Sequence, residues 1–384
     1  MSEKRLKILV FNWQDITNPL AGGAEVHLHE VFERLAARGH KVTLFCHHFA
    51  GAAREETRNG IRIIRKGGRF LFNLHVPLAW WTRFRKDGYD VVVDDVNKIP
   101  FLTPLFIRTP IQGVTHHLFG KSIFLETIWP LAAYVYLSER LIKPVYKHVH
   151  FIIGSPSTHK EYLEWGFPED QVTVVNYCVN RDIYYPDERN SFDEFRLGYF
   201  GRLKKYKSVD HLISAMAVLR GQYPKIRLDI IGDGDDKDRL IAHTQQLGLG
   251  DIVTFHGFIP EEDKAPLLQK MHLVVNTSSK EGWGLTVVEA NACGVPVVAA
   301  NVPGLRDSVV DGRTGLLYEY ANIEDMIGKI KVFLDSVGTR NEFRERALAW
   351  AAEFDWEIAA DRTLELMENS IRKYTLFRSR SERA

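Results

Sequence analysis

Short apolar runs alternate with longer segments of helical periodicity through most of the chain. In the first half, residues 25–39 place Val26, Val31 and Leu35 on one helical face, and Gly39 stands where a helix C-terminus favours a left-handed residue. The apolar runs around this segment have the length of buried strands and cover residues 6–11, 41–46, 61–65, 90–95 and 110–117. The first half is therefore expected to begin with a strand–helix–strand unit and to continue as a sheet.

The second half repeats this alternation more regularly. Its strand-like runs cover residues 196–201, 226–232, 253–257, 272–276 and 295–300. Between and after them, helical patterns cover residues 209–219, 236–247, 261–269 and 285–293. Strands that alternate with helices at this spacing form parallel, doubly wound sheets, so we predict an α/β fold in both halves.

With 384 residues, the chain is too long for one ordinary core. Residues 179–195 are polar, proline-bearing and unpatterned, which favours a domain join there. We therefore predict two Rossmann-like domains, residues 1–183 and 184–355, that face each other across a cleft. The tail, residues 342–374, predicts one or two amphipathic helices broken near residues 354–356, with residues 377–384 frayed.

Composition narrows the class of partner. The 50 Lys and Arg residues nearly balance the 49 Asp and Glu residues, which argues against nucleic acid held by bulk charge. Cys46, Cys178 and Cys293 lie far apart, which suits a reducing compartment and gives no metal-ligand spacing. The start of the chain lacks a signal-peptide pattern, and the apolar stretch 127–138 is too short to span a bilayer. We expect a cytoplasmic protein that at most lies against a membrane.

Loops at the carboxyl ends of parallel strands are where such domains bind ligands. In the loop GRLKKYKS, Arg202 and Lys207 stand just before a predicted helix, an arrangement that suits an anion. Taken alone, four basic residues in a loop are more often a solvated turn.

The stretch SSKEGWGLTVVEANACGVPVV holds Glu281 in a glycine-bearing loop and Glu289 inside the helix that follows. Gly282 and Gly284 let backbone amides approach a ligand, and the helix dipole favours phosphate there. A carboxylate can accept from two neighbouring hydroxyls, so each glutamate suits the diol of a sugar or ribose. The alternative is a helix cap at Glu281 and a surface glutamate at Glu289.

The sequence GDG that follows the strand 226–232 contains Asp233, and Asp235 follows. This pattern is more often a tight turn than a metal site, so we assign no metal. In the first half, Gly22 and Gly23 precede a helix and form a second loop suited to phosphate. His116 and His117 end the run 110–117. No carboxylate or cysteine stands at zinc-ligand spacing with them, so we expect His116 to make a polar contact to a ligand.

Together these motifs resemble the retaining GT-B-fold glycosyltransferases of family 4, also known as glycosyltransferase group 1. The motifs are GGAE at Gly22, GRLKKYKS at Gly201, GDG at Gly232, FHGFI at Phe255 and, most specifically, EGWGLTVVE at Glu281. Their order and spacing cover nearly the whole chain. The resemblance implies an N-terminal acceptor-side domain, a C-terminal domain that binds a nucleotide-sugar donor, and a terminal helix, residues 356–376, that crosses back onto the first domain.

The resemblance also implies roles for particular residues. Glu281 would hold hydroxyls of the donor sugar, Glu289 the ribose, and Arg202 and Lys207 the pyrophosphate. His116 would contact the sugar near its leaving phosphate, although the resemblance leaves open whether His116 or His117 does so. Backbone groups supply the remaining contacts: the amides of Gly282, Trp283, Gly284, Leu285 and Thr286 to the phosphates, the segment with Gly257, Phe258 and Ile259 to the base, and the Gly22–Gly23 loop to phosphate or acceptor.

The expected reaction moves a hexose-type sugar from a UDP- or GDP-linked donor to a hydroxyl acceptor, without a cofactor or metal and with retained anomeric configuration. A nucleotide-sugar epimerase of the same fold and a non-catalytic nucleotide-sugar-binding protein are the alternatives. Residues 67–86 and 119–148 mix aromatic with basic residues, which fits either a membrane interface or ordinary core helices with basic flanks. With the first interpretation, the acceptor is a lipid or lipid-linked sugar and the enzyme is peripheral. The sequence leaves open the base, the sugar, the acceptor and the oligomeric state.

Overall fold

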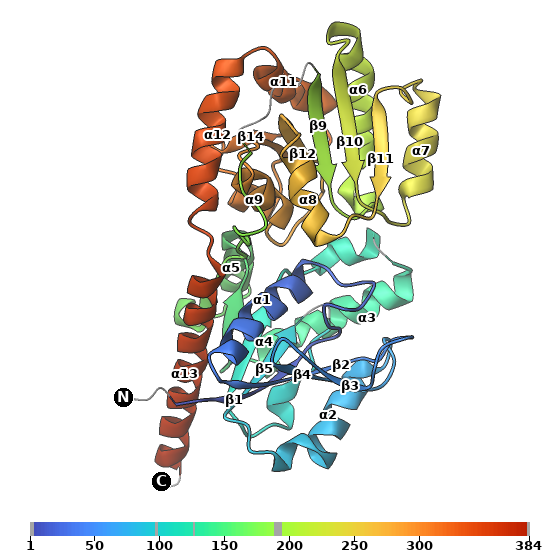
Figure 1. Cartoon of the computed structure of the whole chain (residues 1–384). Coiled ribbons are helices and arrows are strands. Elements are labelled where there is room, and N and C mark those ends of the chain that lie inside the picture. Colours follow the sequence, from blue (N-terminus) through green and yellow to red (C-terminus); the bar gives the residue numbers. More distant parts are fainter. Residues whose placement is uncertain (1–3, 97–98, 126, 188–193, 382–384) are drawn as a thin grey trace. The chain divides into compact units, whose positions relative to one another are not determined.

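The computed structural model describes residues 4–96, 99–125, 127–187 and 194–381, which form two compact units. Unit 1 contains the chain up to Tyr177 and again from Trp356 onward, and unit 2 runs from Cys178 to Asp355 (Figure 1). The boundary thus falls after Tyr177 rather than after residue 183. The intervening residues go with unit 2 because Val179 donates its backbone N–H to Phe354 O at 3.4 Å.

Unit 1 is built on an eight-stranded sheet with the order β3-β4-β2-β1-β5-β6-β7-β8, in which β3 alone runs antiparallel to its neighbour. The five strands expected in the first half are confirmed, two of them (41–46 and 61–65) with the predicted ends and three with shifted ends, whereas β3, β7 and β8 were not predicted. The strands are β1 (Lys7–Phe11), β2 (Lys41–Cys46), β3 (Glu55–Arg58), β4 (Ile61–Arg65), β5 (Val91–Val96), β6 (Ile111–Thr115), β7 (His150–Ile153) and β8 (Val172–Val174).

The helices of unit 1 cover this sheet. They are α1 (Gly23–Ala37), α2 (Phe72–Thr82), α3 (Trp129–Arg140), α4 (Ile142–Val145), α5 (Pro156–Glu164) and α13 (Trp356–Ser381), with 3₁₀ turns at Phe84–Lys86, Thr103–Leu105, Gly120–Leu125 and Glu169–Gln171. Gly39 follows α1 with φ of 94°, the left-handed conformation expected from the sequence. One core cluster of unit 1 joins strand residues such as Phe11 and Phe45 to Phe72 and Trp80 of α2.

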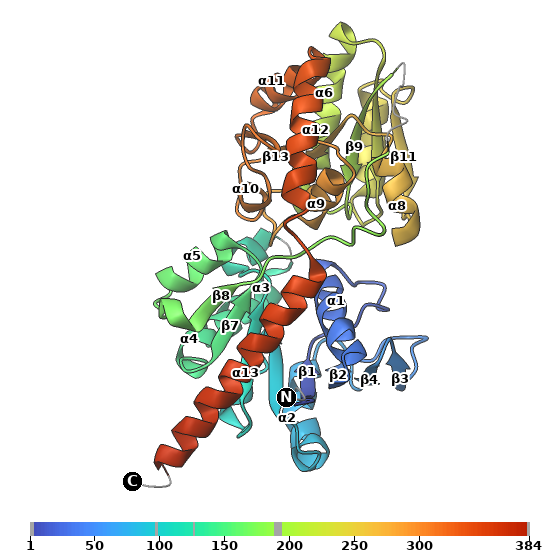
Figure 2. The ribbon, with the colours of Figure 1, turned by 60° about the vertical axis from the view of Figure 1, so that its left-hand side comes forward.

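Helix α13 returns to unit 1 after the whole of unit 2 and packs along α1 and against β6 (Figures 1 and 2). Arg34 of α1 pairs with Glu357 at 3.0 Å, and Ser370 donates to Gln112 Oε1 at 2.9 Å. The predicted break in the tail is confirmed, because α12 ends at Ala351 and α13 begins at Trp356. The predicted fraying is wrong for residues 377–381, which continue α13 because neither glycine nor proline interrupts them.

Unit 2 is a six-stranded, fully parallel sheet with the order β11-β10-β9-β12-β13-β14. The five predicted strands and four predicted helices are confirmed, and β14 with the elements around it was not predicted. The strands are β9 (Phe195–Phe200), β10 (Ile226–Ile231), β11 (Val253–Gly257), β12 (Leu273–Asn276), β13 (Val297–Ala300) and β14 (Gly315–Tyr318). The helices are α6 (Val209–Gln222), α7 (Lys237–Gln246), α8 (Glu261–Leu268), α9 (Leu285–Ala292), α10 (Leu305–Ser308), α11 (Ile323–Leu334) and α12 (Val337–Ala351), with a 3₁₀ turn at Lys205–Lys207.

Candidate functional site

The strand order of unit 2 creates a switch point between β9 and β12. From β9 the chain builds β10 and β11 on one side, and it then crosses to build β12, β13 and β14 on the other. At such a point, loops leave neighbouring strands in opposite directions and open a crevice at the carboxyl edge of the sheet. The two loops that leave here are residues 201–208 and 277–284, which hold the basic motif and Glu281.

Lys207 and Glu281 form an ion pair that joins these two loops. The ammonium of Lys207 donates to Oε1 of Glu281, and the Ser278 hydroxyl donates to the same oxygen at 2.7 Å. The two charged side chains are only 13% and 16% exposed. Burial disfavours the charged form of Lys207, but the attraction of the Glu281 carboxylate is the stronger effect. The pKa of Lys207 is therefore raised, and its side chain stays cationic. Lys207 is therefore not part of a solvated basic turn, and Glu281 is not a helix cap, which were the two alternatives that the sequence left open.

Backbone contacts around this pair require glycine. Gly304 has φ of 83°, and a Cβ there would lie 2.3 Å from the carbonyl oxygen of Glu281. Gly232, of the GDG motif, has φ of 142°, and a Cβ there would lie 1.9 Å from the carbonyl oxygen of Gly201. At Gly304 and at Gly232, the backbone therefore lies closer to the facing carbonyl oxygen than a residue with a Cβ would allow.

Glu289 has a separate set of neighbours. It lies in α9 and is 9% exposed, which excludes a surface glutamate. Burial raises the pKa of its carboxyl group, and Lys264 of α8 and the hydroxyl of Tyr184 partly offset this. Glu261, which receives the hydrogen bond from Tyr184, also contacts Lys264 and follows the FHGFI segment closely in sequence. The structure thus brings Glu289 near the start of α8, next to the segment expected to face the base.

The remaining predicted residues of unit 2 lie around these two carboxylates. Arg202 is exposed, and its carbonyl oxygen accepts from the Tyr199 hydroxyl at 3.2 Å. Trp283 is buried, and its ring lies edge-on to Phe354 with the centroids 5.3 Å apart. Gly284 caps α9 with φ of 96°, and Leu285 and Thr286 begin the helix.

In the FHGFI segment, Gly257 is the last residue of β11, and Phe258 and Ile259 follow it. Gly257 has φ of 75°, and its carbonyl oxygen accepts from Gly232 N at 2.8 Å. Phe258 is 77% exposed, and Ile259 is half-buried.

In unit 1, the switch point lies between β1 and β5, and buried polar side chains gather at the carboxyl ends of β5, β6 and β8. His116 follows β6, and its Nε2 lies 2.9 Å and 3.1 Å from the two carboxylate oxygens of Asp95 on β5. Its Nδ1 is hydrogen-bonded to the hydroxyl of Tyr177, which follows β8. Both ring nitrogens of His116 are therefore engaged within unit 1, and the side chain is only 5% exposed.

Charges within this cluster favour a protonated His116. Burial lowers the pKa of His116, but Asp95 and Glu25 outweigh it and raise that pKa overall. Neighbouring His27, whose ring centroid lies 5.6 Å from that of His116, has its pKa lowered to about 3 by burial and by His116. The surroundings thus favour the charged form of His116 and the neutral form of His27.

The Gly22–Gly23 loop opens helix α1 beside this cluster. Gly22 N donates to Glu25 Oε2 at 2.7 Å and closes the first turn of α1. Burial raises the pKa of Glu25, and its Oε1 makes no hydrogen bond within the described residues. His117 packs against Phe119, with the ring centroids 4.5 Å apart.

Asp95 and Tyr177 are residues of this cluster that the sequence did not single out, and Glu25 entered only as the last residue of the GGAE motif, without a role. Asp95 ends the strand-like run DVVVDD, so its place at a carboxyl edge was a usable signal. Tyr177 carried no comparable signal, and the GGAE motif contained Glu25 but did not indicate that it lies beside His116.

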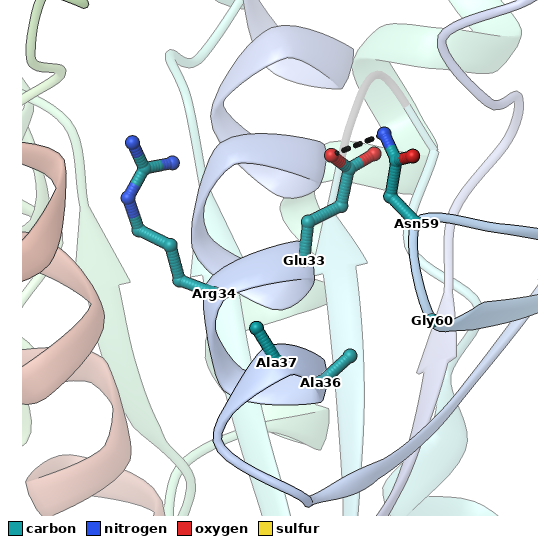
Figure 3. A pocket seen from close by; sticks show the side chains of 6 residues that line it. All are labelled: Glu33, Arg34, Ala36, Ala37, Asn59 and Gly60. Carbon is teal, nitrogen blue, oxygen red and sulfur yellow. Dashed lines mark hydrogen bonds between the residues drawn. The ribbon is translucent and has the colours of Figure 1, made fainter.

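No group of three or more His, Cys, Asp or Glu side chains is placed to hold a metal ion in the part of the chain that the structure describes. A hollow of about 420 Å³ lies elsewhere on unit 1 and is lined by Glu33, Arg34, Ala36, Ala37, Asn59 and Gly60 (Figure 3). It lies between the last turns of α1 and the start of β4, so it is at the amino edge of the sheet and away from the predicted site residues.

Two protein-family models together match residues 21–350 of the chain. The model "Glycosyltransferase Family 4" matches residues 21–183, and "Glycosyl transferases group 1" matches residues 182–350. A curated relative, the D-inositol 3-phosphate glycosyltransferase of Paenarthrobacter aurescens, is 30% identical over 233 residues, which is 57% of this chain and 57% of the relative. The chain therefore aligns with little more than half the length of such relatives.

Solved structures share the fold across nearly the whole chain. Sucrose-phosphate synthase from Thermosynechococcus elongatus superposes with a TM-score of 0.81 at 23% identity, covering 95% of this chain and 99% of that one. HepE from Anabaena, solved with UDP and glucose, gives a TM-score of 0.75 at 19% identity and covers 95% and 100% of the two chains. At these identities the likeness establishes the GT-B fold alone.

Proposed function

The chain belongs to the group 1 glycosyltransferases of the GT-B fold, and we propose that it moves a hexose-type sugar from a nucleoside diphosphate sugar to a hydroxyl acceptor. The observation that carries this proposal is the Lys207–Glu281 pair at the switch point of unit 2. It combines a cation for phosphate with a carboxylate for sugar hydroxyls in the crevice where such sheets bind ligands.

The remaining hydrogen-bonding groups of Lys207 and Glu281 suit a nucleotide-sugar. Lys207 uses one of the three donors of its ammonium on Glu281, so two can reach a pyrophosphate. Both protein contacts to Glu281 fall on Oε1, and Oε2 is the oxygen we assign to a sugar hydroxyl. Arg202 adds an exposed cation on the same loop, and the amides from Gly282 to Thr286 lead into α9, whose dipole favours phosphate.

The other end of the donor is assigned to the α8–α9 side of unit 2. Glu289 would accept from the ribose hydroxyls, and the backbone from Gly257 to Ile259 would face the base. HepE was solved with UDP and with UDP-glucose, which supports a uridine nucleotide as the first ligand to try. GDP-linked sugars remain the second choice.

The reaction would proceed without a metal. Departure of the nucleoside diphosphate leaves negative charge on its outer phosphate, and Lys207, Arg202 and the α9 dipole would stabilise that charge as it develops. We further propose retention of anomeric configuration by a front-face route, in which the leaving phosphate assists deprotonation of the acceptor. Direct contact of His116 with the donor would require one ring nitrogen to exchange its protein partner, Asp95 or Tyr177, for the ligand.

The acceptor is proposed as a growing glycan or a lipid-linked sugar, with the enzyme on the cytoplasmic face of the membrane. An epimerase of the same fold would act on the donor without an acceptor, and a binding protein would show no turnover. Product analysis separates them: transfer yields nucleoside diphosphate and a larger acceptor, an epimerase yields an isomeric donor, and a binding protein yields neither.

Thermal unfolding with UDP, GDP, ADP and their common sugar conjugates tests the donor site. A ligand at a hundredfold excess over its Kd stabilises the folded state by about 2.7 kcal/mol, which predicts a rise in Tm of roughly 5–10 °C for a unit of this size. The Lys207→Ala protein should lose this shift. Lys204→Ala is the matched control, because Lys204 stands on the same loop and pairs with exposed Asp235 at 2.6 Å. Equal shifts in both variants would remove Lys207 from the donor site.

A further inference from the structure

Two helices of unit 1 leave large apolar side chains exposed. The side chains of Phe72, Val76 and Trp80 in α2 point into the core. The opposite side of α2, together with the two residues before it, exposes apolar side chains. Helix α3 behaves in the same way. We call the outward set the apolar face: Phe70, Leu71, Leu74, Leu78 and Trp81 at α2, and Ile128, Trp129, Tyr134, Leu137 and Leu141 at α3.

The two helices that carry this set touch each other. Asn73 of α2 donates to the hydroxyl of Tyr134 on α3 at 2.7 Å, so the two helices are in contact. Along α2 the exposed residues recur every three or four positions, which places them on one side of the helix. Phe70, Ile128 and Trp129 are each more than 70% exposed. Contiguous exposed apolar residues of this kind mark a surface that a partner or a membrane covers.

The charges beside the apolar face have one predominant sign. Exposed basic residues flank the two helices in sequence, while α2 itself contains no acidic residue. The acid of α3, Glu139, is buried and accepts from the backbone N–H groups of Phe119 and Gly120. Among the described residues beside the two helices in sequence, Asp87 is an exposed acid; Glu126, which precedes Ile128 by two positions, lies outside the described residues. The exposed basic residues are Arg69, Arg85, Lys86, Lys121, Arg140, Lys143 and Lys147.

A surplus of cations here is a local feature, because the whole chain carries a formal charge of only +1. The guanidinium of Arg85 lies 4.6 Å from the ring of Trp81, and that of Arg140 lies 4.7 Å from the ring of Tyr136. Aromatic rings beside Lys and Arg are typical of a membrane interface, where the rings enter the headgroup region and the cations meet anionic lipid. Protein–protein interfaces, in contrast, are depleted in lysine.

We propose that the apolar face and its basic flanks dock unit 1 onto the surface of a bilayer that contains anionic lipid. The described part of the chain has no helix with both the length and the apolar character needed to cross a membrane. The contact is therefore a peripheral one, with α2 and α3 lying at the interface. This inference concerns binding alone and stands independently of the proposed sugar transfer.

Flotation with vesicles tests the proposal on the full chain without any donor. Vesicles of phosphatidylcholine with phosphatidylglycerol should carry the protein, and vesicles of phosphatidylcholine alone should carry much less. Raising the salt concentration from low to above physiological should weaken the binding, because screening shortens the reach of the basic flanks. Equal binding to both kinds of vesicle, or none to either, would overturn the proposal.

Paired charge insertions locate the surface. Leu74→Glu with Leu78→Glu should lower the affinity for anionic vesicles at least about tenfold, because two apolar side chains no longer leave water. The matched control is Val337→Glu with Ile358→Glu, whose side chains are as exposed but lie on α12 and α13. Equal losses in the two pairs would contradict this location.

A second copy of the chain is the other occupant to exclude. Sedimentation velocity of the wild-type protein should show a monomer whose sedimentation does not change in the Leu74→Glu, Leu78→Glu variant. A dimer that this variant dissociates would show that the face joins two copies instead, and the membrane proposal would fail.

Discussion

The two polar clusters of this molecule occupy equivalent places, the carboxyl edges of two parallel sheets, but they are built differently. In unit 2, Lys207 and Glu281 are partly exposed, and each retains donors or acceptors beyond their mutual contact. In unit 1, Asp95 and Tyr177 engage both ring nitrogens of His116, and Glu25 is buried beside them. Place in the fold alone therefore does not identify a ligand site: the polar atoms left over at Lys207 and Glu281 belong to partly exposed side chains, whereas the unsatisfied Oε1 of Glu25 is buried.

The largest effect is expected from substitutions of the Lys207–Glu281 pair in unit 2. The Lys207→Ala and Glu281→Gln proteins should each lose about a hundredfold or more of the transfer rate, because each removes a group proposed to act on the reacting donor. Both proteins should stay folded at the assay temperature, although each loses the Lys207–Glu281 ion pair, whose side chains are only 13% and 16% exposed. The rate is measured as nucleoside diphosphate release with a fixed acceptor, and Lys204→Ala serves as the control. A variant with full activity would remove its residue from the site.

In unit 1 the main effect should be on stability. Asp95→Asn leaves the buried imidazolium of His116 without its carboxylate, which should lower the free energy of unfolding by about 3–5 kcal/mol. Exposed Asp87→Asn is the matched control and should change it by less than about 0.5 kcal/mol. Denaturant titration followed by fluorescence measures both. If Asp95→Asn abolished transfer at unchanged stability, the cluster would be a reaction site after all.

The same cluster predicts a pH dependence of known sign. The folded-state pKa of His116 is raised above its ordinary value of 6.5, so protonation stabilises the folded state. This contribution is complete below pH 6.5 and is lost as the pH rises through the folded-state pKa. The difference in unfolding free energy between the wild-type and His116→Asn proteins should therefore shrink above pH 6.5. A difference that grows with pH would mean that His116 is neutral in the fold.

The smallest effect is expected at Glu289, which lies in unit 2. Because burial raises the pKa of its carboxyl group, ionisation of Glu289 disfavours the folded state, and the penalty grows as the pH rises. Glu289→Gln should thus be at least as stable as the wild-type protein at pH 8, while its affinity for the preferred nucleotide falls about tenfold. Isothermal titration of that nucleotide checks the second part. Unchanged affinity would separate Glu289 from the ribose.

The sequence was most informative where local pattern and tertiary role coincide. The strand–helix alternation of unit 2 depends on short-range periodicity, so its sheet and the positions of Glu281 and Glu289 could be predicted. Strand β3 could not, because the polar segment Glu55–Arg58 pairs only at the antiparallel edge of its sheet. Helix α2 was ambiguous for the opposite reason: it is apolar on its exposed side as well as on its buried one.

The unit 1 cluster shows why site residues are harder to predict than strands. His116 was singled out by its place after a strand, but its hydrogen-bond partners come from β5 and from the segment after β8. The sequence separation gives no indication of which partner takes which ring nitrogen. Predicting whether His116 is available to a ligand requires the tertiary structure.

The return of α13 to unit 1 has a consequence for biosynthesis. Unit 2 is continuous in the chain, whereas unit 1 must wait for α13, which is translated after all of unit 2. At about 5–20 residues per second, the surface of α1, which ends at Ala37, stays without α13, which begins at Trp356, for roughly 15–65 s. During that interval, Arg34 and Arg38 lack Glu357 and Asp361, the carboxylates that they meet in the finished fold. The domain that begins first on the ribosome is therefore the one that is completed last.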